Sequence, residues 1–176
     1  MITKSQHTIQ RWKYAAVSGG RGYLAAFMAV GLLLGASVNQ AAPFVLSGDG
    51  QEATDTATGL IWRRCLEGMT WNGSTCNNAA NFYTHEQAFQ RATSQATLSN
   101  AAWRLPNVKE LETLLIENPP TATLVDAAIF PNTPPDLFWT STPYASDGNG
   151  VWVVDFSVGV VAAVLRSNIN YLRLVR

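Results

Sequence analysis

Cys65 and Cys76 are the only cysteines of this 176-residue sequence, and ten residues lie between them. Cysteines at such a spacing usually pair when a chain folds in an oxidising compartment. A metal site would need further nitrogen or sulfur ligands, and His85 is the only histidine after residue 42. The sequence therefore predicts a disulfide between Cys65 and Cys76, and no metal site or cofactor.

His85 carries the side chain best suited to acid–base chemistry near neutral pH. It stands at the expected start of a helix, and no partner that would orient it for catalysis is evident. We therefore expect His85 to be a solvated residue of the first helical turn. The chain also lacks the G-x-S-x-G and H-E-x-x-H motifs and a phosphate-binding glycine loop. We expect no catalytic residues and a protein that is not an enzyme.

Asparagine and aspartate side chains gather in two segments of the second half of the chain. Residues 118–137 form a long connection with five prolines, and residues 143–150 form a turn. Loops held on a rigid scaffold often carry binding sites, and proline lowers the cost of ordering them. The expected ligand-binding residues are Asn132, Asp136, Tyr144, Asp147 and Asn149. The alternative is that the connection simply packs against the sheet. Carboxylate and amide oxygens could also hold calcium, although beside proline they are ordinary turn formers.

Two arginines lie within the expected framework. Arg104 precedes a helix and Arg173 stands in the last expected strand. We expect both to pair with carboxylates such as Glu110 or Asp155, and so to tie strands to a helix.

The first 42 residues have the parts of a secretory leader. Four basic residues and no acidic one precede residue 43, and an apolar stretch runs from about Tyr23 to Gly35. The apolar stretch is short for a membrane span, so we expect cleavage within residues 36–42 and a periplasmic or cell-surface protein. The alternative is an uncleaved N-terminal anchor, which would be the only membrane contact.

The region from Pro43 onward carries 8 basic and 12 acidic side chains, a net charge of −4. Such a balance argues against a nucleic-acid partner, because nucleic-acid binding relies on positive charge. One domain over residues 43–176 is expected.

Two helices followed by strands are expected in this domain. Thr84 to Gln87 has the form of a capping box, and Asn107 with Glu110 forms a second one. Alternating apolar residues then predict antiparallel strands at 138–141, 151–156, 160–166 and 171–176, with an earlier strand at 60–63. The order of these elements indicates an α+β domain, with two helices packed on antiparallel strands and a long irregular loop.

Five segments resemble a known family when they are taken in order. They are Asp55-x-x-Thr58-Gly59-Leu60-x-Trp62, Trp103-Arg-Leu-Pro-Asn107-x-x-Glu110-Leu111, Phe138-Trp-Thr-Ser141, Val151-Trp-Val-Val-x-Phe156-x-x-Gly159 and Tyr171-Leu-Arg-Leu-Val-Arg176. Together they are similar to the Lcl C-terminal domain family over about residues 50–176. The resemblance implies a fold related to C-type lectin-like and formylglycine-generating-enzyme-like domains. Members typically carry a cysteine where Leu174 stands here, so the long-range disulfide of lectin-like domains is not expected.

The leader, the missing catalytic motifs and the resemblance together favour an exported, non-catalytic domain for recognition or adhesion, similar to lectin-like adhesion modules, with a glycan or an envelope protein as its partner. A structural subunit of an envelope or pilus assembly is the alternative. Activity like that of the formylglycine-generating enzymes is the least favoured reading. Those enzymes use cysteines in the later half of the domain, and both cysteines here lie in the first half.

Overall fold

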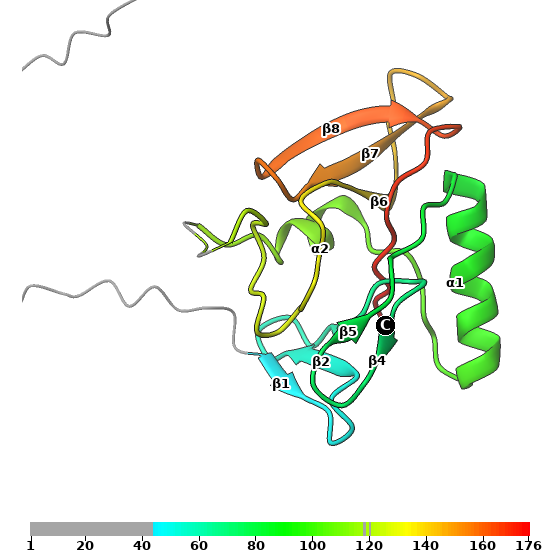
Figure 1. Cartoon of the computed structure of the whole chain (residues 1–176). Helices are drawn as coiled ribbons and strands as arrows, with labels where there is room; N and C mark the ends of the chain where they lie inside the picture. The colour runs from blue at the N-terminus through cyan, green and yellow to red at the C-terminus, as the bar shows by residue number, and fades with distance from the viewer. Residues whose placement is uncertain (1–43, 118, 120) are drawn as a thin grey trace, which may run out of the picture. The chain divides into compact units, whose positions relative to one another are not determined.

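The computed structural model describes residues 44–117, 119 and 121–176, so the expected leader lies outside the described residues. Two helices and eight strands follow one another in this part of the chain (Figure 1). In order they are β1 (Phe44–Leu46), β2 (Glu52–Asp55), β3 (Ile61–Arg63), β4 (Thr70–Trp71), β5 (Cys76–Asn77), α1 (His85–Ser99), α2 (Val108–Glu112), β6 (Leu137–Pro143), β7 (Gly150–Asp155) and β8 (Val160–Leu165). Among the described residues, no helix is long and apolar enough to span a membrane.

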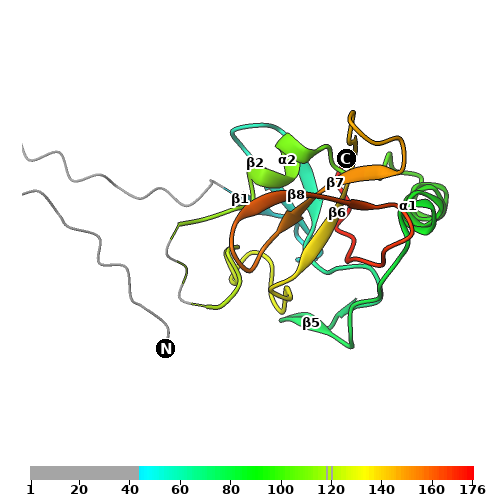
Figure 2. The same ribbon diagram turned by 90° about the horizontal axis from the view of Figure 1, so that it is seen from above.

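The strands form three antiparallel sheets, in the orders β1-β2-β3, β4-β5 and β6-β7-β8. Helices and antiparallel strands together confirm the α+β class. Figure 2 shows α1 nearly end-on beside the sheet of β6, β7 and β8.

Both helices begin where their capping boxes predict. The Thr84 hydroxyl accepts the Gln87 N–H, and the Gln87 side chain accepts the Thr84 N–H in return. Asn107 and Glu110 make the same exchange at the start of α2. Each exchange satisfies two backbone donors that a helix start otherwise leaves without partners.

The C-terminal segment is not the regular strand that its alternation predicts. It makes isolated bridges instead: Tyr171 with Phe138, and Val175 with both Trp62 and Arg104. Figure 1 shows this segment, in red, running from the end of β8 past α1. Its residues bond to separate segments in turn, so no continuous ladder forms with one neighbour. Leu172 and Leu174 of this segment pack into the same apolar cluster.

Strands β6 and β7 are buried on both faces, whereas β8 contains no buried residue. Phe138 and Val154 enter one apolar cluster, while Trp139 and Val153 enter the other. Residues on both faces of β7 are therefore fully buried, including Val151, Val153 and Val154. Trp152 of the same strand is half-buried.

The long connection before β6 packs against the rest of the domain. Val125 and Phe130 are each 1% exposed, and Phe130 makes an edge-on ring contact with Phe44 at 5.3 Å. Thr123 and Thr133 are buried too, and the Thr123 hydroxyl donates to the Thr133 carbonyl. The central part of the connection therefore packs against the domain, which was the alternative to a binding loop.

Candidate ligand-binding site

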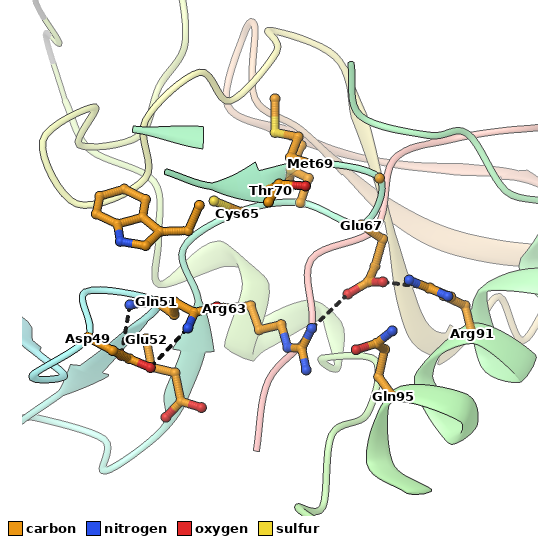
Figure 3. Close-up of a pocket in the computed structure, with 13 residues that line it drawn as sticks. Asp49, Gln51, Glu52, Arg63, Cys65, Glu67, Met69, Thr70, Arg91 and Gln95 are labelled. Carbon is orange, nitrogen blue, oxygen red and sulfur yellow. Dashed lines mark hydrogen bonds and ion pairs between the residues drawn. The ribbon is translucent and has the colours of Figure 1, made fainter. Parts of the chain in front are cut away.

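A polar pocket of about 320 Å³ lies between the first sheet (β1-β2-β3), the disulfide-bearing loop (residues 65–76) and α1. Figure 3 shows its lining side chains. They are Asp49, Gln51, Glu52, Arg63, Cys65, Leu66, Glu67, Gly68, Met69, Thr70, Trp71, Arg91 and Gln95. We call this the charged pocket.

Glu67 is the central charge of the charged pocket. Its carboxylate accepts from Arg91 Nε at 2.6 Å and lies 3.5 Å from Arg63 Nη1. Figure 3 shows Glu67 between the two guanidinium groups, with Gln95 beside Arg91. The Glu67 side chain is only 4% exposed, so its charge requires partners to offset the loss of hydration.

The two arginines reach Glu67 from different elements. Arg63 ends β3 and its guanidinium lies 4.8 Å from the Trp103 ring centre, which fixes its direction. Arg91 lies on α1, whose start is set by the capping box at Thr84. The side chains therefore meet because β3 and α1 are held against the same loop.

Gly68 allows the loop to turn beneath the pocket. Its φ is +98°, and a Cβ there would lie 2.7 Å from the backbone nitrogen of Asn81. Only glycine adopts such a conformation without strain at so close an approach. The backbone at Glu67 is held by the Asn81 N–H, which donates to the Glu67 carbonyl at 2.9 Å.

The predicted disulfide between Cys65 and Cys76 is present, with the two Cα atoms 5.4 Å apart. It stabilises the disulfide-bearing loop, which forms one wall of the charged pocket. Arg64, the neighbouring residue, is 4% exposed and donates to the carbonyls of Gly50, Ala128 and Ile129. Its guanidinium also lies 4.4 Å from the centre of the Trp71 ring. The wall is thus attached to the first sheet and to the long connection.

The remaining acidic groups at the rim also have partners. Glu52 accepts from Arg176 at 2.6 Å. Asp49 accepts from the Ser47 hydroxyl and from Gln51, and these hydrogen bonds hold the pKa of Asp49 below its ordinary value. The charges around the pocket are therefore largely compensated within the protein.

The five predicted ligand-binding residues fall at opposite ends of β6. Asp136 precedes Leu137, which pairs with Asp155, whereas Tyr144 follows Pro143, which pairs with Val151. Asn132 has a positive φ of 57°, and its side chain donates to the Cys76 carbonyl at 2.8 Å. Asn132 thus fastens the long connection to the disulfide-bearing loop.

Three predicted residues do lie together, beside a shallow hollow at the other end of the strand. Tyr144 and Asp147 line it, and Asn149 is exposed in the same turn. The Tyr144 ring stands edge-on to Trp152 at 4.9 Å. The Asp147 carboxylate accepts the Asn149 N–H, which is an ordinary turn contact.

His85 is not a solvated residue, because it is 2% exposed. Arg166 Nη1 lies 2.9 Å from Nδ1 of His85, and Nε2 lies 3.0 Å from the Thr140 carbonyl oxygen. A guanidinium can only donate, so Nδ1 accepts and Nε2 carries the proton given to Thr140. Burial, and then the positive charge of Arg166, lower the pKa of His85.

Of the two arginines that were expected to pair with carboxylates, only Arg104 does so among the described residues. Arg104 makes two hydrogen bonds to Glu110, both at 2.8 Å, and these lower the pKa of Glu110. Arg173 is 1% exposed and pairs with no carboxylate among the described residues. It donates instead to the carbonyls of Arg63 and Arg64 and to the Thr133 hydroxyl. Burial lowers the pKa of Arg173 to about 9, so the group stays charged at neutral pH.

Nothing in the spacing of the charged-pocket residues indicates that they meet. Glu67 and Arg91 stand 24 residues apart, and both look like ordinary surface charges. The sequence contains only a weak indication that these arginines lie at the edge of the core. Arg63 follows the core residue Trp62, and Arg91 precedes the core residue Ala92. Within the described part of the chain, no group of three histidine, cysteine or acidic side chains could hold a metal ion.

The fold is that of a small α+β domain with one local disulfide. The charged pocket, which contains the Glu67 ion pairs, lies on its surface. A family model named Lcl C-terminal domain matches residues 51–176, and the chain belongs to that family. A comparison with curated proteins found no match.

Proposed function

We propose that this protein is an exported, non-catalytic recognition domain that binds neutral sugar units of a glycan in the charged pocket. The observation that carries the proposal is the Arg63–Glu67–Arg91 ion-pair group on the wall of a polar hollow. Export is supported by the leader-like first 42 residues and by the disulfide, which an oxidising compartment favours.

Charge compensation favours a neutral ligand over a charged one. A sulfate or phosphate group bound to Arg91 or Arg63 would lie close to the Glu67 carboxylate, whose negative charge would repel it. Moving that carboxylate away from the arginines would leave a buried charge without partners, which is costly. A cationic ligand would likewise be repelled by the two arginines.

Unused hydrogen-bonding groups favour a ligand with hydroxyls. Arg91 bonds Glu67 through Nε, and neither of its Nη groups has a partner among the described residues. The Gln95 carboxamide is likewise without a partner there, and one Glu52 oxygen remains as an acceptor. A sugar hydroxyl both donates and accepts, so neighbouring hydroxyls can use such a mixed set. The half-buried Trp71 supplies an apolar surface for the ring carbons.

A glycan array carrying neutral, sulfated and phosphorylated glycans tests this function. We expect binding to neutral glycans that is insensitive to salt, since no net charge is exchanged. Gln95→Leu should weaken it by losing an amide that contacts only the ligand. Gln90→Leu is the matched control, because Gln90 lies on α1 outside the charged pocket. Binding confined to anionic glycans, or equal binding by both variants, would refute the proposal.

The Tyr144 hollow is the other place where a ligand could be held, as the sequence suggested. A Tyr144→Ala/Asp147→Ala variant on the same array distinguishes the two sites, since it leaves the charged pocket unchanged.

A structural role in an envelope or pilus assembly is the second candidate function. The observation that favours it is β8, which has a neighbouring strand on one side only and carries exposed apolar side chains.

A further inference from the structure

The outer edge of β8 is open in the described part of the chain. The sheet order β6-β7-β8 gives β8 one neighbour, and no isolated bridge in the described part of the chain involves its residues. An edge strand presents unpaired backbone N–H and C=O groups, which can pair with another strand.

The register tells which residues of β8 face outward. The Tyr144 N–H donates to the Gly150 carbonyl, so even-numbered residues of β7 bond toward β6. The Arg166 N–H donates to the Asn149 carbonyl at the end of the β7-β8 ladder. In that ladder the odd-numbered residues of β7 therefore bond to the even-numbered residues of β8. Antiparallel ladders alternate, so the backbone groups of Val161, Ala163 and Leu165 point away from β7. Of these, the Leu165 carbonyl already accepts the Asn168 N–H at 3.0 Å.

The usual protection of an open edge is missing here. Residues 156–165 contain no charged residue and no proline, and β8 itself reads Val-Val-Ala-Ala-Val-Leu. Soluble proteins commonly guard such an edge with lysine, proline or an inward-pointing charge. Large apolar side chains are exposed on β8 and its flanking turns, namely Val158 (62%), Val160 (50%), Leu165 (51%) and Ile169 (59%). An unguarded edge with this composition is suited to a permanent partner strand.

We propose that β8 pairs antiparallel with β8 of a second copy of this chain, about a two-fold axis at Ala163. A two-fold axis normal to a sheet keeps each side chain on its own face, so paired residues must be both odd or both even. Pairing about Ala163 places Val161 opposite Leu165 of the other copy, and Ala163 opposite itself. The strand is therefore self-complementary in size, with a small residue at the centre and a large apolar residue on each side.

The outward backbone groups fit this register. The two Ala163 residues exchange both of their hydrogen bonds, and each Leu165 N–H reaches the Val161 carbonyl of the other copy. The two sheets join into one continuous sheet, in which Val161 and Leu165 of the two copies become cross-strand neighbours on one face.

Sedimentation of the purified full-length chain and two variants tests this dimer. Ala163→Pro removes an outward N–H that β7 does not use, so the fold should survive while the dimer dissociates. Leu98→Lys changes an exposed apolar residue of α1 and serves as the control. We expect twice the chain mass for the wild type and the control, and the chain mass for Ala163→Pro, with circular dichroism unchanged. A monomeric wild type, or a dimer that Ala163→Pro leaves intact, overturns the proposal.

A second measurement remains decisive if Ala163→Pro fails to fold. Across a hydrogen-bonded antiparallel pair the Cα atoms lie about 5.5 Å apart, which a disulfide can bridge. An Ala163→Cys variant should therefore form a covalent dimer under mild oxidation, whereas Leu98→Cys, on α1, should not. The native cysteines are already paired and contribute no free thiol. Equal cross-linking of the two variants, or none, overturns the proposal.

Discussion

Removing the disulfide by Cys65→Ala/Cys76→Ala should lower the free energy of unfolding by about 3 kcal/mol. The two cysteines are 11 positions apart, and the chain-entropy model gives a stabilisation of that size for such a loop. Cys76 is 1% exposed and its carbonyl accepts from Asn132. Because the folded loop is already held at this point, removing the disulfide should give the native state little new conformational entropy to offset the loss of stability. In thermal unfolding the same change corresponds to a fall of roughly 10 °C in Tm for a domain of this size.

Denaturant unfolding of the wild type and the double variant, followed by tryptophan fluorescence, measures this difference directly. A thiol reductant should destabilise the wild type to a similar extent and leave the variant unchanged. A loss below about 1 kcal/mol would show that the loop is held by its packing and hydrogen bonds instead of by the covalent link. The inference that the disulfide braces the pocket wall would then be wrong.

The remaining predictions concern single residues. The pKa of His85 is lowered in the fold, so its contribution to stability is complete above its unfolded pKa of about 6.5 and is lost as pH falls from there toward the folded value. Unfolding free energies measured between neutral and mildly acidic pH should therefore fall more for the wild type than for His85→Gln; parallel curves would contradict this. Asn107→Ala should cost about 1 kcal/mol by removing the cap of α2, and an unchanged stability would contradict the capping box. Gly68→Ala should cost about 2 kcal/mol or more, because Gly68 has a positive φ and its Cβ would meet Asn81; a neutral result would show that the loop relaxes freely.

Local signals predicted the local parts of this fold. The capping boxes at Thr84 and Asn107 each involve residues three positions apart, and both helices begin there. The turn at Asp55 is equally local, since its carboxylate accepts from Ala57 and Thr58 and Gly59 has a positive φ. Such contacts depend on a few neighbouring residues and therefore appear in the sequence.

Features made by distant segments could not be predicted in the same way. Arg173 donates to carbonyls more than a hundred positions away, so its sequence neighbourhood does not identify its partners. The burial of His85 depends on Thr140 and Arg166, which only the folded chain brings to the start of α1. The charged pocket likewise arises where β3, the disulfide-bearing loop and α1 meet.

The most direct test of the central claim is a nuclear magnetic resonance titration with the neutral glycan that binds best on the array. Binding at the charged pocket should shift the side-chain amide signals of Gln95 and the Nε signal of Arg91, which line that pocket. The signals of Tyr144 and Asp147 should stay in place, because those residues line the other hollow. Shifts confined to Tyr144 and Asp147, or no shift at Gln95 and Arg91 at saturation, would contradict recognition at the charged pocket.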